Sequence, residues 1–151
     1  NQLHNIFPNG VDALAIFSSE HSYVSPNWYP TKAEPHRHVP TWNYQVVHMK
    51  GRLSFDYSNK SKLRVVGSLT KLYERLHFGD EGWKMSDAPK DFMGQMLDSI
   101  VAFQFDVESV IAKSKLSQNR ELKDFNSVKR NMQAQSKKHL FDAMGGIEKE
   151  L

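Results

Sequence analysis

Two short stretches of the chain combine residue types that can bind a charged, flat ligand. They are Lys115-Leu116-Ser117-Gln118-Asn119-Arg120 and Val39-Pro40-Thr41-Trp42-Asn43-Tyr44. Lysine and arginine beside a serine and an asparagine suit an anion, usually a phosphate, held by charge-assisted hydrogen bonds. An aromatic ring next to an amide suits a flat heterocycle that stacks on the ring and is fixed by its polar edges. Together the two stretches predict a site for a phosphorylated planar cofactor.

Strand patterns position both stretches. The short apolar run 13–17 predicts a strand buried on both faces, 18–20 a turn, and 21–25 the returning strand of a hairpin. The longest strand pattern is 41–57, in which Gly51 marks a bulge or a bend. Strict alternation over 101–107 predicts a half-buried strand that leads the chain to Lys115.

Helical patterns fill the intervals between these strands and follow the last one. Apolar residues over 59–79 recur at helical spacing, and Gly79 is a natural stop. Ser86 and Asp87 offer N-cap oxygens for a second helix over 87–99. A last helix over 121–144 carries an apolar stripe that is thin through its middle. The regular strand–helix alternation of a parallel sheet is absent, which favours an antiparallel barrel with helices outside it.

Composition points to one globular domain, 1–151, in the cytoplasm. The chain has 39% hydrophobic and 25% charged residues, no cysteine, and no apolar run of the roughly 20 residues that span a bilayer. Without cysteine there is no disulfide and no thiolate chemistry, which fits a reducing compartment. The net charge of +3 is diffuse, so it only weakly indicates an anionic partner. Neither a Gly-x-Ser-x-Gly elbow nor a glycine-rich phosphate loop occurs.

Three ordered motifs resemble the PaiB-type proteins, described as FMN-binding negative transcriptional regulators. The first motif spans 13–17 and 21–29, the second is 39–44 with Val47-His48 and Gly51, and the third is 115–120. The resemblance implies an FMN-binding split β-barrel, antiparallel with peripheral helices, that forms a homodimer with flavin sites at the subunit interface. Family members carry strands and a helix before the point that matches Asn1, so the chain resembles the interior of a longer protein.

The FMN site expected from the motifs contains nine residues: Trp28, Tyr29, Trp42, Tyr44, Lys115, Ser117, Gln118, Asn119 and Arg120. The cations and polar groups would bind the phosphate or the ribityl chain, and the aromatics would flank the isoalloxazine ring or close over it. Other roles stay open. Ser117 or Asn119 suits a helix cap, and strand aromatics commonly fill a core or a dimer interface.

Two other functions are compatible with a split barrel. One is an FMN-dependent oxidoreductase similar to flavin reductases, in which the flavin carries the hydride chemistry. The other is a haem-binding protein with His36, His38 or His48 as ligand. No carboxylate accompanies these histidines at a metal-ligand spacing, so no metal site is expected. Paired lysines and arginines at 129–130 and 137–138 make DNA a further partner to test. We expect a regulator rather than an enzyme.

Overall fold

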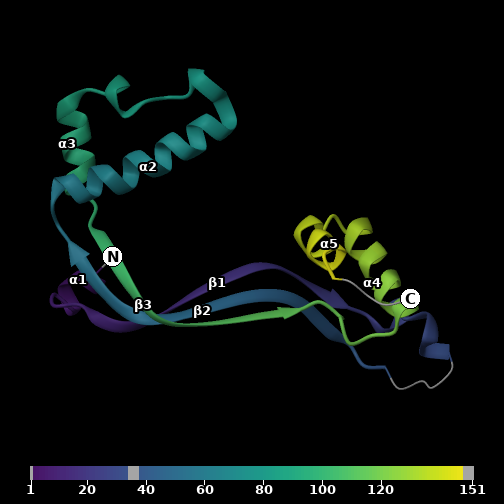
Figure 1. The fold of residues 1–151 in the computed structure, drawn as a ribbon. Coiled ribbons are helices and arrows are strands. Elements are labelled where there is room, and N and C mark those ends of the chain that lie inside the picture. The colour runs from purple at the N-terminus through teal and green to yellow at the C-terminus, as the bar shows by residue number, and fades with distance from the viewer. Residues whose placement is uncertain (1, 34–37, 148–151) are drawn as a thin grey trace. The chain divides into compact units, whose positions relative to one another are not determined.

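The computed structural model describes residues 2–33 and 38–147. Three long strands form one open sheet in the order β1-β2-β3 (Figure 1). Their bounds are β1 Val11–Val24, β2 Thr41–Asp56 and β3 Ala102–Lys115. The described helices are α1 Leu3–Ile6, α2 Asn59–Phe78, α3 Lys90–Asp98, α4 Leu122–Ala134 and α5 Lys138–Gly145. The fold is thus mixed α/β, with one three-stranded sheet among the described residues.

The sheet is antiparallel, as two contacts between β2 and β3 illustrate. Gln45 on β2 donates to Ser114 on β3 at 2.9 Å, whereas Gly51, further along β2, faces the earlier residue Asp106 of β3. Rising numbers on one strand therefore meet falling numbers on the next. The two backbones approach closely at Gly51, because a Cβ there would be 2.1 Å from the Asp106 carbonyl oxygen.

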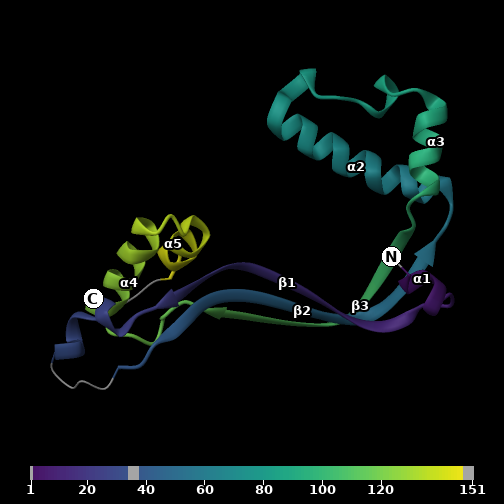
Figure 2. The same ribbon diagram turned by 180° about the vertical axis from the view of Figure 1, so that it is seen from behind.

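The chain divides into two compact units, and each strand contributes one part to each. The first unit comprises Asn1–Ala13 and Lys50–Glu108, and the second comprises Leu14–Met49 and Ser109–Leu151. In the first unit α2 and α3 are joined by the short 3-10 turns η3 Gly79–Glu81 and η4 Met85–Asp87 (Figure 2). The Lys62 ammonium of α2 is buried and donates to the Leu97 carbonyl of α3 at 2.9 Å.

The beginning of α2 is fixed by a cluster of hydrogen bonds to one carboxylate. Asp56 accepts from the Ser61 hydroxyl at 2.6 Å and from the Ser58 backbone amide at 2.8 Å. Hydrogen bonds from the side chain of Ser61, and then from the side chain and backbone of Ser58, lower the pKa of Asp56 to about 2. The Ser58 hydroxyl also accepts from the Ser61 amide and thereby caps the helix.

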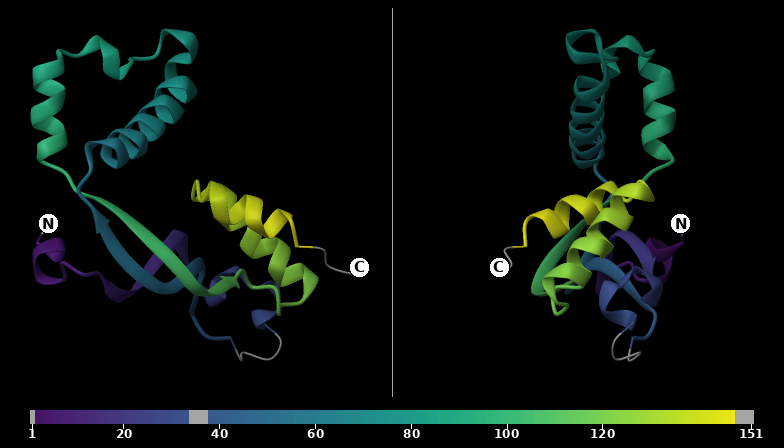
Figure 3. Two further views of the ribbon diagram at one scale, coloured as in Figure 1. Left: turned by 60° about the vertical axis from the view of Figure 1, so that its left-hand side comes forward. Right: turned by 90° about the vertical axis from the view of Figure 1, so that its right-hand side faces the viewer.

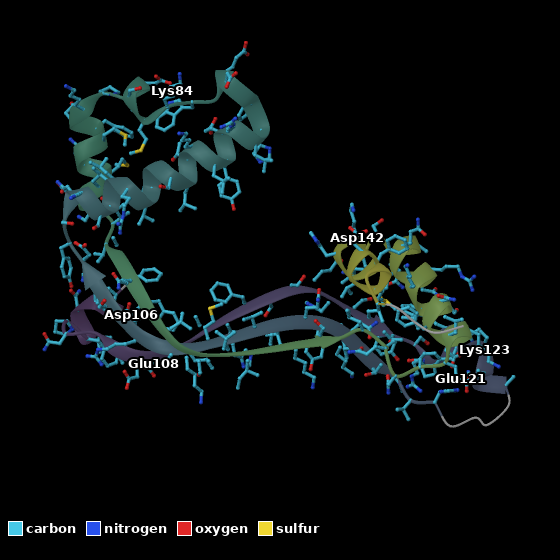
Figure 4. All side chains as sticks on the ribbon, viewed as in Figure 1. Lys84, Asp106, Glu108, Glu121, Lys123 and Asp142 are labelled. Carbon is cyan, nitrogen blue, oxygen red and sulfur yellow. The ribbon has the colours of Figure 1, made fainter. Side chains whose placement is uncertain are left out.

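The second unit contains the main hydrophobic core. There α4 and α5 pack side by side on one face of their part of the sheet (Figure 3). Figure 4 shows Glu121, the N-cap of α4, beside Lys123 in the first turn of the helix. The Lys123 ammonium and the Glu121 carboxylate are 4.0 Å apart. The buried core residues are Val24, Tyr29, Leu116, Phe125, Val128, Met132, Leu140 and Met144.

Several expectations from the sequence were wrong. Residues 18–20 form no turn, because β1 continues through them to Val24. Leu14, Ile16 and Phe17 are about half exposed and not buried on both faces (48%, 56% and 57%). The strand expected over 101–107 forms part of β3, but most side chains of β3 are exposed and the expected half-buried face is absent.

The helix boundaries also differ from the expected ones. The second helix begins at Lys90 after Pro89, and Ser86 and Asp87 belong to η4. The last helix is interrupted at residues 135–137, where Ser136 has φ +58° and the chain turns from α4 into α5. No helix among the described residues is long and apolar enough to cross a membrane.

Candidate functional site

The 115–120 segment begins at Lys115, the last residue of β3, and is anchored to β2 by its side chains. Ser117 has φ +60° and is buried, and its hydroxyl donates to the Oδ1 atom of Asn43 at 3.0 Å. Asn43 is fully buried and donates in turn to the sulfur of Met144 on α5 at 3.8 Å. This chain of contacts joins the loop, the central strand and the last helix. Ser117 therefore serves the packing of this chain.

Two neighbours of Ser117 are held in the same way. The Gln118 side chain accepts from the Leu116 amide at 2.6 Å and donates to the Ser114 carbonyl at 2.7 Å, which closes a tight local turn. The Lys115 ammonium donates to the Thr41 hydroxyl and is only partly exposed. Asn119 is exposed. The segment thus presents cations and one amide from a firmly held loop.

An aromatic groove lies on the other face of the same strands. Because Trp42 and Tyr44 alternate with the buried Asn43, their side chains leave the sheet on the face away from the core. The Trp42 ring is 49% exposed and lies 5.6 Å from His21 and 5.8 Å from Tyr23, between ring centroids. A groove of about 570 Å³ is lined here by Ser18, Ser19, His21, Trp42, Tyr44, Gln45 and Val46.

A cation borders this aromatic groove. The Lys113 ammonium on β3 lies 6.0 Å from the centre of the Tyr44 ring. The sequence patterns singled out Trp42 and Tyr44 but not Lys113, His21 or Tyr23. The strand alternation of β1 and β3 is the signal that places these three on one face, once the register of the sheet is known.

A second cluster surrounds Arg120. Its guanidinium lies over the Tyr29 ring, 4.6 Å from the ring centre, and its Nη1 atom lies 3.4 Å from Nδ1 of His38. The ring centres of Tyr29 and His38 are 4.9 Å apart. The buried Tyr29 hydroxyl has no hydrogen-bond partner among the described residues.

This cluster continues into the interior through Thr31 and Asp124. The Thr31 hydroxyl lies 2.9 Å from Nε2 of His38 and donates to a carboxylate oxygen of Asp124 at 2.6 Å. Asp124 is 1% exposed and stands in the first turn of α4, where the helix dipole favours a negative charge. Neither Thr31 nor Asp124 was singled out by the sequence patterns.

The nine residues expected to bind FMN thus fall into three groups. Trp42 and Tyr44 line the open groove. Tyr29 and Arg120 stack on each other at the edge of the core, with Trp28 packed against that core. The remaining four form the held loop: Lys115, Ser117, Gln118 and Asn119. Among the histidines considered as haem ligands, His36 lies outside the described residues, and both ring nitrogens of His38 face protein groups.

The groove and the loop fit the parts of a flavin nucleotide. A volume of about 570 Å³ falls within the range of small-molecule sites, roughly 300–1,000 Å³. Its aromatic lining suits the isoalloxazine ring, and the Lys113 ammonium at its border suits an anionic group. Lys115 and Arg120 are not among the lining residues of the groove and would suit a phosphate at the separate loop. The donor set therefore matches a phosphorylated heterocycle.

Comparison with known proteins gives the class of this chain. A family model described as "Putative FMN-binding domain" matches residues 1–109, and the chain belongs to this family. The resemblance to PaiB-type proteins is confirmed, and with it FMN as the cofactor of the family.

The curated relatives include one named bacterial protein. The chain is 37% identical over 123 residues to the protease synthase and sporulation protein PAI 2 of Bacillus subtilis strain 168. The matched residues cover 81% of this chain and 55% of that protein. An uncharacterized protein of Aspergillus fumigatus is 29% identical over 121 residues, covering 71% of this chain and 46% of the relative. The chain thus spans about half the length of these curated relatives.

Proposed function

We propose that this chain binds FMN through the aromatic groove, with the isoalloxazine ring against Trp42 and Tyr44. The observation that carries the proposal is the groove itself, which opens away from the core and has an aromatic lining with Lys113 at its border. Lys115 and Arg120 bind the phosphate. Ser117 and Gln118 hold the loop that presents these cations, and their side chains are already engaged within the fold.

A homodimer completes this proposal. Exposed apolar side chains on β3 support it, because a single chain leaves Phe103, Val107, Val110 and Ile111 between 48% and 65% exposed. Apolar surface of this kind normally marks an interface. The outer edges of β1 and β3 are unpaired within the described sheet. Closing the sheet into the split β-barrel of the family would remove such edges.

The cellular role that we propose is negative regulation of transcription in the cytoplasm, as in the PaiB-type resemblance. The name of the Bacillus subtilis relative is protease synthase and sporulation protein PAI 2. Within the described residues, the paired cations Lys129–Arg130 and Lys137–Lys138 are the surface on which DNA contact is most readily tested. The competing function is a flavin-dependent oxidoreductase. A regulator need not turn over, whereas an oxidoreductase must.

Three experiments test the proposal. Titration of FMN fluorescence with the protein should show saturable quenching near one flavin per chain. NADH or NADPH should then fail to reduce the bound flavin catalytically, and steady turnover would favour the oxidoreductase. For the dimer, sedimentation should give twice the chain mass. Ile111→Lys should shift the protein to monomer, whereas Gln133→Lys at an exposed position of α4, away from β3, should not.

A further inference from the structure

The contacts of Thr31 determine which nitrogen of His38 carries hydrogen. Asp124 accepts two hydrogen bonds from Thr31, one from the backbone amide at 3.1 Å and one from the hydroxyl at 2.6 Å. The hydroxyl has a single hydrogen, and this geometry directs it to the carboxylate. The Thr31 oxygen, 2.9 Å from Nε2 of His38, can then only accept. Nε2 of His38 must therefore be the donor.

The contact with Arg120 leads to the same assignment from the other side of the ring. A guanidinium carries only donors, so Nδ1 of His38, 3.4 Å from Nη1 of Arg120, must accept. Both contacts are satisfied by one form of the imidazole, which is neutral with its hydrogen on Nε2. Two independent neighbours thus agree on the same tautomer.

Arg120 is consequently held from two directions. The Tyr29 ring supports the flat face of the guanidinium at 4.6 Å, and the Nδ1 lone pair of His38 accepts from its edge. With the hydrogen on Nδ1 instead, two donors would face each other at 3.4 Å, and Arg120 would have to move. The buried carboxylate of Asp124 is therefore connected to the position of Arg120 through two intervening side chains.

We propose that Asp124, Thr31 and His38 form a relay that positions Arg120 for the phosphate of FMN by fixing the tautomer of His38. This inference rests on the proposed function, in which Arg120 contacts the phosphate. His38 acts on Arg120 and not on the cofactor. The relay therefore contributes to selection of FMN over the unphosphorylated flavin.

Asp124→Asn tests the relay because it should reverse the tautomer. The Thr31 backbone amide requires an acceptor, so the new carboxamide oxygen stays opposite it and the amide nitrogen faces the Thr31 hydroxyl. The hydroxyl would then accept from the amide and donate to Nε2 of His38, which moves the ring hydrogen to Nδ1. An uncharged substitution that leaves the shape intact can disable a relay in this way.

The readout is the ratio of the affinities for FMN and riboflavin, measured by fluorescence titration of the full chain. Asp124→Asn and Thr31→Val should weaken FMN binding roughly ten- to one-hundred-fold, the loss of one hydrogen bond to a charged group. Riboflavin binding should not change. Thr31→Ser keeps the hydroxyl and should restore the ratio. His38→Phe should behave as Thr31→Val does, whereas His139→Phe on the exposed surface of α5 is the matched control.

Nitrogen-15 NMR of the histidine rings gives a second readout that does not depend on flavin. The wild-type protein should show His38 with hydrogen on Nε2, and Asp124→Asn should move it to Nδ1. Hydrogen on Nδ1 in the wild type would overturn the relay. An unchanged affinity ratio in the variants, or an equal loss for both flavins, would also overturn it. A wild type that binds FMN and riboflavin equally would instead refute the phosphate contact, and the relay with it.

Discussion

Gly51→Ala should separate two strands that the fold holds unusually close. A Cβ at residue 51 would lie 2.1 Å from the carbonyl oxygen of Asp106, 2.9 Å from its carbonyl carbon and 3.0 Å from the Cα of Val107. These are all backbone atoms of β3. No flexible side chain can move aside, so β2 and β3 themselves must shift.

The size of the effect follows from that geometry. Contacts of 3.4 Å or more are ordinary for a Cβ, so the strands must part by more than 1 Å at this point. Such a shift would break about two ladder hydrogen bonds, each worth about 1 kcal/mol, and add overpacking strain of about 1–3 kcal/mol. We therefore expect Gly51→Ala to lower the free energy of unfolding by about 3–5 kcal/mol.

Urea unfolding followed by circular dichroism measures this loss. The matched control is Gly94→Ala on α3, because a Cβ there meets nothing within 4 Å. Alanine in an open helical position should be neutral or stabilise by up to about 1 kcal/mol. If Gly51→Ala unfolds at the same urea concentration as the wild type, the close approach of β2 and β3 is refuted.

Three further predictions concern the site and the first unit. Trp42→Leu should weaken FMN and riboflavin binding alike, by about 1–3 kcal/mol in a fluorescence titration, because ring stacking does not depend on the phosphate; a loss confined to FMN would contradict the assignment. Lys115→Ala and Arg120→Ala should each weaken FMN binding by about 1.5–3 kcal/mol and spare riboflavin, and unchanged FMN affinity in both would return the segment to a structural role. The pKa of Asp56, lowered from 3.8 to about 2, predicts stability that is fully present above pH 4 and is lost as the pH falls toward 2. The stability of Asp56→Asn should therefore depend less on pH between 4 and 2 than that of the wild type, as measured by acid unfolding. Equal pH dependence of the two proteins would refute the role of Asp56.

Local patterns predicted the elements whose signal is contained in their own residues. The helix α2 ends at Phe78, and its C-cap is Gly79, whose positive φ of +63° is readily adopted only by glycine. The close approach at Gly51 also left a local trace, since glycine within a strand indicates a bulge or a neighbouring backbone. In both cases one residue carries the steric requirement.

Features set by tertiary contacts were not predictable in this way. Residues 18–20 look like a turn, yet pairing with β2 keeps β1 extended through them. The break at Ser136 lets Leu140 and Met144 enter the same core as the buried residues of α4. The thin apolar stripe was the only local sign of this interruption.

The candidate site also has features that local residues predict and features that only tertiary contacts determine. The residue types in 39–44 and 115–120 were sufficient to indicate cations and aromatics for a phosphorylated ring. The pairing of Ser117 with Asn43 spans 74 positions in the sequence, and that of Thr31 with Asp124 spans 93. No local pattern reports such distant partners. The sequence therefore predicted which chemistry the candidate site would offer, and the structure added which of its groups contact one another.

A crystal structure of the FMN complex tests the central claim most directly. The account predicts the isoalloxazine ring in the groove beside Trp42 and Tyr44, with the phosphate in contact with Lys115 or Arg120. A flavin bound elsewhere on the chain, with the Trp42 groove empty, would contradict it.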